Sequence, residues 1–415
     1  MVYSRSAFLT GALRFGAVSA AVPSLLLDAR LAERVLADGP GASAQNILVV
    51  VQLAGGNDGL NMIVPYGDSL YYQKRPTLAI PGRQVLPLTH GLGLHPGLHR
   101  LKGLYDRGKV AVVQGVGYAN PSFSHFRATD IWQSAAPTGA VDTGWLGRYL
   151  DSALAGSANP LKALSIGPVL PKAFFAKQTL VPAVDSLESF QLLAGRQGPA
   201  EAQRLSAAFQ RITAARTSGQ GPYLSLIQLA DTGAYRATVD LLHVKSTPAS
   251  TVAYPDSDLA NQLKLVSQII ATDLGTRVFM VTQQGFDDHA LEQTPFVYPR
   301  LMSDLDAALA SFHADMVAQG RADRVLLMTF SEFGRRPQEN GSQGTDHGAA
   351  APMLVIGGGV KGGLYGDTPS LAHLDDGNLR FGIDFRSVYS TVLAKWMNAD
   401  PTPAVLGTFP TLPFI

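Results

Sequence analysis

Five runs of apolar residues, each the length of a β-strand, constrain the fold of this 415-residue chain more than any other feature. They lie at residues 47–53, 110–113, 278–281, 325–328 and 353–356. A continuous apolar run of this length is typical of a strand that is covered on both faces. Because helical patterns separate several of the runs, the sequence predicts an α/β fold with a largely parallel central sheet between helices.

The segments between the runs complete this picture. Amphipathic patterns at 258–274, 299–319 and 384–397 predict helices. Residues 151–255 are rich in Ala, Ser, Gly and Pro and carry few side chains suited to chemistry, with one helical pattern near 200–215. We interpret this segment as an inserted region or cap within a domain that spans residues 45–415.

The first 44 residues resemble an export signal. They contain SRSAFL at residues 4–9, an apolar stretch at 16–27 that Pro23 interrupts, and an Ala-Ser-Ala cleavage site at 42–44. The pattern is similar to a twin-arginine signal in which Ser6 replaces the second arginine. It predicts a periplasmic or secreted protein that meets the export machinery, and the stretch is too short for a stable membrane span. The alternative is an amphipathic N-terminal helix retained in a cytoplasmic protein.

Composition excludes several classes of function. The formal net charge is +1, so the chain lacks the basic field that binding to nucleic acid requires. Cysteine is absent, which excludes disulfides, thiol nucleophiles and zinc–thiolate sites. Any metal ion must therefore be held by oxygen and histidine ligands.

Polar residues follow the apolar runs with unusual consistency. In open α/β sheets, ligands bind beyond the carboxyl ends of the strands. The segments expected there are residues 55–59 (GGNDG), 122–126 (SFSHF), 285–289 (GFDDH), 331–335 (SEFGR) and 344–348 (GTDHG). Their convergence predicts a functional site at this edge of the sheet.

The acidic and imidazole side chains of these segments form a candidate metal site. The set comprises Asp58, Asp287, His289, Glu332, Asp346 and His347. Oxygen and imidazole ligands suit one or two divalent cations such as Zn, Mn, Mg or Ca. Asp287 and His289 are two residues apart, so on an extended segment both side chains face the same way. Asp346 and His347 are adjacent, so we favour His347 as the ligand and expect Asp346 either beside it or behind it.

Each of these residues also has an ordinary structural interpretation. An aspartate after a strand is commonly a turn or cap residue, and a single histidine is commonly a hydrogen-bonded structural residue. The prediction of a metal site therefore rests on the convergence of several segments.

Ser124 is the candidate nucleophile. If a helix begins there, its backbone N–H groups and dipole would stabilise an attacking alkoxide. The alternative is that Ser124 is only a helix cap, and Ser122 could play either part. Asn57, His125 and Arg335 are candidate substrate contacts, although Arg335 could equally be a surface arginine.

At these residues the sequence resembles the bacterial DUF1501 family, a domain of unknown function within the alkaline phosphatase and sulfatase superfamily. The matching stretches are LVVVQLAGGNDGLNMIVPY at 48–66, SHF at 124–126, GFDDH at 285–289, TFSEFGR at 329–335 and GTDHG at 344–348. The resemblance implies an alkaline-phosphatase-like three-layer α/β/α sandwich. It also implies two bound metal ions and a Ser or Thr nucleophile.

The resemblance assigns roles to individual residues. Asp58 matches the aspartate that holds one metal ion, and Ser124 matches the nucleophile. Asp287 and His289 match ligands of the second ion, and His347 matches the last histidine ligand. Glu332 takes the place of an Asp-His pair whose histidine Phe333 replaces.

These observations predict an exported metal-dependent hydrolase of a phosphate or sulfate ester, with a small molecule or a glycan as substrate. The alternative is a catalytically inactive cell-envelope protein that uses the same fold for binding or assembly. A nucleotide-binding oxidoreductase is disfavoured because no G-x-G-x-x-G motif follows the first apolar run.

Overall fold

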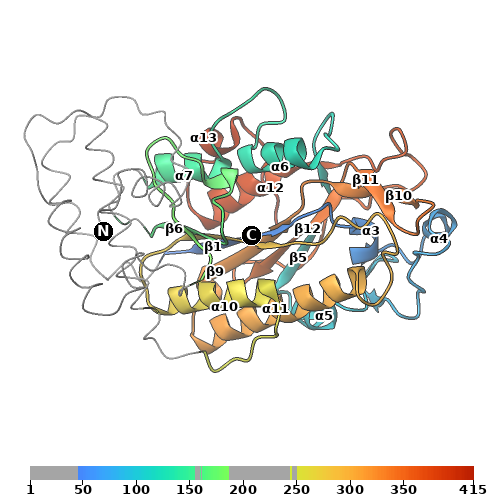
Figure 1. The fold of residues 1–415 in the computed structure, drawn as a ribbon, viewed down its shortest axis with the longest axis horizontal. Helices are drawn as coiled ribbons and strands as arrows, with labels where there is room; N and C mark the ends of the chain where they lie inside the picture. Colours follow the sequence, from blue (N-terminus) through green and yellow to red (C-terminus); the bar gives the residue numbers. More distant parts are fainter. Residues whose placement is uncertain (1–44, 155–158, 160, 187–243, 245–249) are drawn as a thin grey trace, which may run out of the picture.

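The structure, a computed structural model, describes residues 45–154, 159, 161–186, 244 and 250–415. Its centre is a nine-stranded sheet with the order β13-β5-β12-β9-β1-β8-β6-β7, in which β14 also pairs with β5 (Figure 1). The strands are β1 (Ile47–Leu53), β5 (Val110–Gly117), β6 (Ala163–Ile166), β7 (Ala183–Val184), β8 (Val278–Gln283), β9 (Val325–Phe330), β12 (Ala351–Gly357), β13 (Gly363–Tyr365) and β14 (Ile383–Asp384). All five predicted apolar runs lie in this sheet, which confirms that part of the prediction.

Helices cover both faces of the sheet. One layer contains α5 (His99–Asp106), α10 (Asp258–Ala271) and α11 (Tyr298–Ala318). The other contains α6 (His125–Ser134), α7 (Trp145–Ala153), α12 (Phe385–Thr391) and α13 (Thr402–Val405) (Figure 1). The predicted three-layer α/β/α arrangement with a largely parallel sheet is thereby confirmed.

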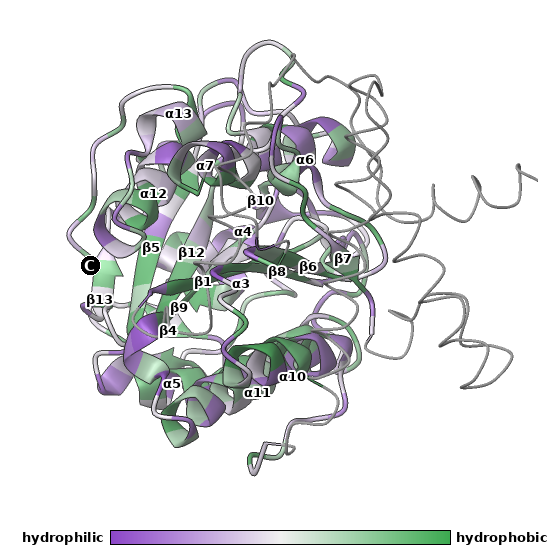
Figure 2. Ribbon diagram, turned by 90° about the vertical axis from the view of Figure 1, so that its left-hand side faces the viewer, coloured by the Kyte–Doolittle hydropathy of each residue, from purple (hydrophilic) through white to green (hydrophobic). Residues whose placement is uncertain are grey.

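Alternation along β1 explains why its sequence is apolar apart from Gln52. Val49 and Val51 pack into the core beneath α10 and α11, whereas Leu48 and Val50 pack into the core on the opposite face. Figure 2 shows hydrophobic residues along the strands and on the helices that cover them. Because neither face of β1 meets water, the strand has no polar alternation.

Strand β12 runs against its neighbours. It pairs antiparallel with both β5 and β9, whereas every other pairing among the described strands of the central sheet is parallel. An antiparallel strand begins at the edge where parallel strands end. The segment that enters β12 is therefore delivered to the carboxyl edge of the sheet.

The predicted helices occur close to their expected bounds. α10 begins after Ser257, whose hydroxyl accepts a hydrogen bond of 3.3 Å from the Ala260 N–H. α11 matches the pattern at 299–319, and the pattern at 384–397 forms α12 followed by a π-helical turn at Val392–Trp396. The helix expected near 200–215 lies outside the described residues.

The segment interpreted as a cap, residues 151–255, contributes β6 and β7 to the central sheet. A short 3-10 helix at Lys172–Phe174 lies between them. This part of the segment extends the main sheet. Most of the remainder lies outside the described residues, as does the expected export signal, so the cap and the signal stay predictions.

Two smaller sheets complete the carboxyl edge. β10 (Gly334–Glu339) and β11 (Thr345–Gly348) form an antiparallel hairpin between β9 and β12. β2 (Ile63–Val64), β3 (Leu86–Pro87) and β4 (Gly93–Leu94) form the other sheet, close to α3 (Gly59–Met62) and α4 (Ser69–Lys74). A 3-10 helix at Ala322–Arg324 precedes β9. Among the described residues, none of the helices combines the length and hydropathy needed to cross a membrane.

Candidate metal centre

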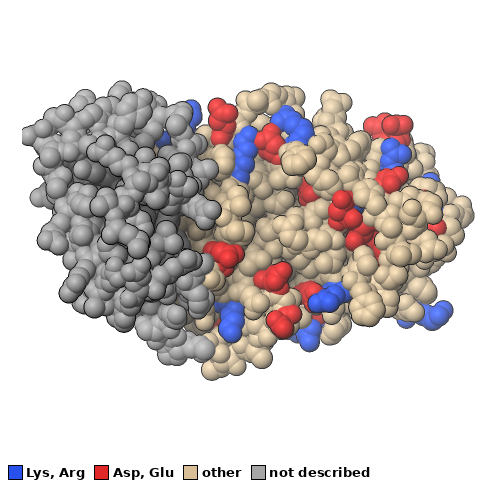
Figure 3. All heavy atoms as spheres, viewed as in Figure 1, with Lys and Arg blue, Asp and Glu red and all other residues tan. Residues whose placement is uncertain are grey.

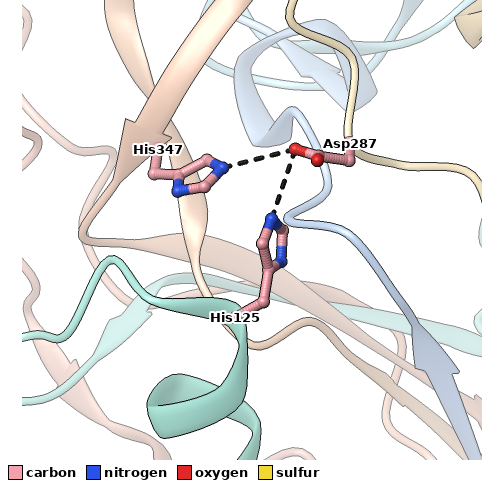
Figure 4. A group of neighbouring side chains, drawn as sticks. All are labelled: His125, Asp287 and His347. Atoms are coloured by element: carbon pink, nitrogen blue, oxygen red, sulfur yellow. Dashed lines mark hydrogen bonds and ion pairs between the residues drawn. The ribbon is translucent and has the colours of Figure 1, made fainter.

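Three segments bring ligand-type side chains to one point at the carboxyl edge. His125 begins α6 after β5, Asp287 follows β8, and His347 lies on β11 before β12 (Figure 4). His125 Nε2 and His347 Nε2 lie 3.4 Å and 3.3 Å from the same oxygen, Asp287 Oδ1. One ligand atom from each of the three residues lies within 4.8 Å of the others.

His289 joins these residues as a fourth member. Its Nε2 atom lies 3.1 Å from Asp287 Oδ1 and 2.9 Å from His347 Nε2. We refer to His125, Asp287, His289 and His347 as the His-Asp cluster. Asp287 and His289 therefore face the same centre, as their spacing in the sequence predicts.

The rings of two histidines are oriented from behind by hydrogen bonds. His125 Nδ1 lies 3.0 Å from Glu332 Oε1, and His347 Nδ1 lies 2.7 Å from the carbonyl oxygen of Phe123. Both oxygens only accept hydrogen bonds, so each Nδ1 carries the proton. Each Nε2 lone pair is then directed at the centre, and His125 Nε2 is buried without a hydrogen-bond partner among the described residues.

The donor set of the cluster fits a divalent cation. Imidazole lone pairs and a carboxylate oxygen repel one another unless a positive charge lies between them. Ligand atoms around tetrahedral zinc, with bonds of about 2.0–2.1 Å, are about 3.3 Å apart. The recorded separations of 2.9, 3.1, 3.3 and 3.4 Å are close to that spacing.

The surroundings of the cluster shift the pKa values of two members, His347 and Asp287, towards the ligand form. Burial lowers the pKa of His347, although the Phe123 carbonyl and the Asp287 carboxylate, which would both accept hydrogen bonds from the protonated ring, act in the opposite direction. Burial acts to raise the pKa of Asp287, but the hydrogen bonds and charges of its neighbours, Arg335 foremost, together outweigh it and lower the pKa below the usual value. Phe333 packs against His347 and His125, with ring centroids 4.3 Å and 4.9 Å apart, and forms an apolar wall.

Glu332 and Asp346, both expected as ligands, lie behind the cluster. Glu332 Oε1 accepts a hydrogen bond of 2.8 Å from the Gly55 N–H in addition to its contact with His125. Asp346 Oδ1 lies 3.7 Å from His289 Nδ1, on the side of the ring away from the centre. Neighbouring residues of β11 point to opposite faces, so only His347 of this pair faces the cluster.

Arg335, a candidate substrate contact in the sequence analysis, is occupied by other protein groups. Its side chain is buried, and its N–H groups donate to the carbonyl oxygens of Gly56 (2.6 Å), Thr345 (2.8 Å) and Phe286 (2.8 Å). It also donates to Asp287 Oδ1 at 2.9 Å. Arg335 therefore ties the exits of β1 and β8 to β11 and holds Asp287 in place.

Asp58 does not join the cluster either, which corrects the predicted ligand set. Its carboxylate forms a buried two-point ion pair with Arg75, in which Arg75 Nη2 lies 2.8 Å from Asp58 Oδ1 and Nη1 contacts Oδ2. Burial acts to raise the pKa of Asp58, but the charge and hydrogen bonds of Arg75 outweigh it and hold the pKa below its usual value. No sequence pattern connects position 58 with position 75.

Asn57, an expected substrate contact, is also buried in the protein. Its side-chain oxygen lies 2.9 Å from the Tyr298 hydroxyl, and its amide nitrogen lies 3.1 Å from Met62 Sδ. The turn after β1 is thus directed inward, beneath the segments that carry the His-Asp cluster.

Two further acidic residues near the cluster lacked a role in the sequence analysis. Glu292 is buried and accepts hydrogen bonds from Asn61 Nδ2 (3.1 Å) and Thr345 Oγ1 (2.9 Å). Burial and the nearby Asp58 charge raise the pKa of Glu292 well above its usual value. Burial also raises the pKa of Asp288 to about 7, and its Oδ2 has no hydrogen-bond partner among the described residues. A lone carboxylate in a loop carries no sequence signal for such burial.

Ser124 occupies the N-cap position of α6, yet its exposed hydroxyl accepts no capping hydrogen bond from the described backbone. The nearby Ser122 hydroxyl instead accepts a hydrogen bond of 3.3 Å from the Ser124 N–H. Ser124 lies between Phe123, whose carbonyl contacts His347, and His125, which belongs to the cluster. His125, expected as a substrate contact, is thereby found among the ligand-type residues.

Several solved structures are similar to the chain. A protein in the alkaline phosphatase superfamily from Vibrio parahaemolyticus has 9% identity and a TM-score of 0.37, with 87% of this chain and 68% of that chain covered. The PsFucS1 sulfatase from Pseudoalteromonas sp. has 12% identity and a TM-score of 0.39, with coverage of 92% and 74%. The C-terminal periplasmic domain of EcEptC from Escherichia coli, in complex with Zn, has 13% identity and a TM-score of 0.33, with coverage of 77% and 74%.

Sequence comparisons give the family. No curated protein matches the chain. The family model described as "Protein of unknown function (DUF1501)" matches residues 112–404 and so includes every member of the His-Asp cluster. Because this match spans well over half of the sequence, the chain belongs to the DUF1501 family.

Proposed function

We propose that this chain is a metal-dependent hydrolase of a phosphate or sulfate ester, in which the His-Asp cluster holds a single divalent cation. The observation that carries the proposal is the convergence of three imidazole nitrogens on Asp287 Oδ1, at 3.1, 3.3 and 3.4 Å. Two of these imidazoles have their Nδ1 atoms bonded to acceptors, so their lone pairs face the centre. This arrangement favours a cation over a structural hydrogen-bond network.

The count of one ion follows from the placement of the remaining residues. Asp58, the expected ligand of another ion, is neutralised by Arg75 in the protein interior. Phe333 fills the space beside His125 and His347 with an aromatic ring. The sequence predicts one or two divalent cations, and we propose that the site binds one.

The chemistry assigns different tasks to the residues around the site. When bound, a divalent cation supplies Lewis-acid stabilisation to an ester oxygen at the site. The Ser124 hydroxyl attacks phosphorus or sulfur and gives its proton to solvent water, so that a bond to Ser124 Oγ forms and the bond to the leaving oxygen breaks as that oxygen takes up a proton from water. A water molecule then attacks the same phosphorus or sulfur, which releases phosphate or sulfate and restores the Ser124 hydroxyl. The N-terminus of α6 stabilises the negative charge that develops beside Ser124. Glu332 keeps the proton on His125 Nδ1 and fixes the direction of its lone pair.

Metal content and turnover, measured on the same preparations, test this proposal. Wild-type protein should contain about one equivalent of divalent ion and hydrolyse an aryl phosphate or an aryl sulfate. Ser124→Ala should keep the ion and lose turnover, whereas His347→Ala should lose both. The matched control is His373→Ala, which removes an exposed histidine outside the cluster and should change neither. Folded wild-type protein without bound metal would contradict the proposal.

A second candidate is a binding or assembly protein of the cell envelope. The observation that favours it is that Asp58, Asn57 and Arg335, all expected at the site, are engaged with other protein groups. Bound metal without turnover on a broad panel of phosphate and sulfate esters would support this candidate over the hydrolase.

We also propose that residues 1–44 direct export to the periplasm or the medium. The support is the signal-like order of a polar start, an apolar stretch and an Ala-Ser-Ala site. Expression in a bacterial host followed by fractionation and N-terminal sequencing tests this. An exported protein should begin at Gln45, and a cytoplasmic protein that retains residues 1–44 would contradict the proposal.

A further inference from the structure

Large apolar side chains are exposed at the same edge of the sheet as the His-Asp cluster. They lie on the segments that follow β5 and β8 or precede β14, and they are Phe123, Phe126, Leu291, Phe296 and Phe381. Single exposed apolar residues are ordinary, whereas several that lie close together can form a binding surface.

Two of these residues adjoin the cluster through their backbone. The Phe123 carbonyl accepts the hydrogen bond from His347 Nδ1 at 2.7 Å, and Phe126 follows His125 in the first turn of α6. Their side chains are 37% and 91% exposed. The loop before them is anchored because the Ser122 N–H donates to the Tyr118 hydroxyl at 3.0 Å. The backbone that carries the two phenylalanines is therefore anchored beside the site, and both side chains are open to solvent.

Phe381 approaches from another segment. A Cβ atom built on Gly117, the last residue of β5, would lie 2.9 Å from Phe381 Cβ and 3.0 Å from the carbonyl oxygen of Ala349. Ala349 is two residues beyond His347, so Phe381 and the segment that enters β12 both lie close to the last residue of β5. We refer to Phe123, Phe126 and Phe381 as the phenylalanine rim.

Within the part of the chain that the structure describes, no basic side chain with a free donor is recorded in contact with the cluster, so a second anionic group on a substrate would find no partner there. Among the described residues, Arg335 is the one Lys or Arg side chain recorded in contact with the cluster, and it is buried with its donors already used. Figure 3 shows basic and acidic side chains scattered over one face of the described part of the molecule, not gathered into one basic field. A substrate would therefore contact the cation with its reacting group. The rest of the substrate would contact apolar side chains.

We propose that the site takes esters whose non-reacting part is an aromatic or alkyl group that packs on the phenylalanine rim. This inference rests on the proposed hydrolase function for the reacting group. Such a site would favour apolar esters over esters of sugars. Sugar hydroxyl groups would lose water against these side chains without gaining hydrogen-bond partners.

A binding series separates this inference from catalysis. Alkylphosphonates from methyl to hexyl carry an anionic group that the site cannot hydrolyse, and their affinity for the zinc-loaded protein is measured by calorimetry. Affinity should rise by roughly two- to fourfold per added methylene, the upper value applying to a fully buried methylene. The double variant Phe126→Ser/Phe381→Ser should bind methylphosphonate as wild type does but lose this dependence on chain length.

Val317→Ser is the matched control. Val317 is 56% exposed and lies in the last turn of α11, which leads from the carboxyl edge of β8 towards the start of β9 at the opposite edge. This variant should keep the wild-type dependence. Equal affinity along the series in wild type, or an unchanged dependence in the double variant, would overturn the inference.

Turnover distinguishes failure of the inference from failure of the proposed function. Wild type should hydrolyse naphthyl and phenyl esters with a kcat/KM at least tenfold above that for a sugar 6-phosphate or 6-sulfate. Efficient turnover of the sugar ester alone would overturn the apolar specificity and keep the hydrolase. A chain-length dependence of binding with no turnover of any ester would support the rim and overturn the hydrolase.

Discussion

The direction of the imidazole lone pairs in the His-Asp cluster depends on residues that do not face the centre. Glu332 fixes His125, and the Phe123 carbonyl fixes His347, each through Nδ1. A buried carboxylate behind a histidine also makes the ring a stronger ligand. The contribution of Glu332 to metal binding can therefore be separated from that of a direct ligand.

Glu332→Ala should lower the affinity for zinc by about 10–100-fold and leave one site per chain. Glu332→Gln, which keeps an acceptor for His125, should lose less. The measurement is competition with a chelator of known affinity. Glu339→Ala is the control, because this carboxylate lies on the same hairpin and contacts Thr77. Loss of the whole site in Glu332→Gln would show instead that Glu332 is a direct ligand.

The buried ion pair of Asp58 and Arg75 should contribute to folding stability and not to metal binding. Arg75→Met leaves Asp58 charged and buried without its partner, and should lower the free energy of unfolding by about 3–5 kcal/mol. Adding Asp58→Asn in the same chain should recover part of that loss. Denaturant unfolding measures both effects.

Metal content decides the role of Asp58 independently of stability. In the folded Asp58→Asn/Arg75→Met protein it should stay at the wild-type value. A drop to zero would restore Asp58 to the ligand set.

His95 gives a pH dependence of stability away from the cluster. Burial lowers the pKa of His95 to about 4 from its ordinary value of 6.5, and its Nδ1 accepts a hydrogen bond of 2.9 Å from the Gly97 N–H. The unfolded chain therefore binds a proton at a higher pH than the folded chain. Stability should fall as the pH decreases from 6.5 towards 4, by about 3 kcal/mol in total from this group.

His95→Asn keeps a hydrogen-bond acceptor and cannot become charged. Its free energy of unfolding, measured between pH 7 and pH 4.5, should decrease less steeply than that of wild type. Equal slopes for the two proteins would show that His95 does not make this contribution. The comparison uses slopes because the smaller side chain also changes stability at every pH.

At the scale of elements, the site depends on how strand exits are joined. Residues 344–348 reach the carboxyl edge because β12 is antiparallel to β5 and β9. Arg335 on β10 then connects backbone carbonyls of the β1 exit, the β8 exit and β11. A guanidinium can make these contacts together because its donors spread in a plane, whereas an ammonium group is a single point.

Arg335→Lys should therefore lower the free energy of unfolding by roughly 3–5 kcal/mol, since several buried carbonyls lose their donors. It should also weaken zinc binding, because Asp287 loses a contact that positions it. The neighbouring half-buried Arg336 provides the control, and Arg336→Lys should change both quantities little. If the two variants unfold at the same denaturant concentration, Arg335 does not join these segments as described.

At the scale of the whole molecule, the cluster joins segments more than 200 residues apart, from His125 to His347. A cation bound there should stabilise the folded chain, because an unfolded chain has no such site. With zinc at 100 times its dissociation constant, the stabilisation should be about 2.7 kcal/mol. Tm should rise with zinc concentration and return to its starting value with a chelator. The variant His289→Ala/His347→Ala should show no such rise, and an equal rise in both proteins would place the binding elsewhere.

The sequence by itself determined five strands of the central sheet, the helical patterns at 258–274, 299–319 and 384–397, and the edge at which the polar segments meet. Apolar runs such as 47–53 and the polar residues that follow them are local patterns, and they follow from burial and chain geometry. The spacing of Asp287 and His289 placed both on one side of an extended segment, where the structure has them. These features depend on neighbours along the chain, which a sequence displays directly.

Only the tertiary structure decided which polar residues share the centre. Asp58 and His125 both follow apolar strands, yet one is paired with Arg75 and the other faces Asp287. The different positions of Asp58 and His125 depend on the direction of β12 and on the inward course of the turn after β1. They also depend on which distant residue each side chain contacts. Such choices arise from the energies of contacts between distant segments, which no local pattern records.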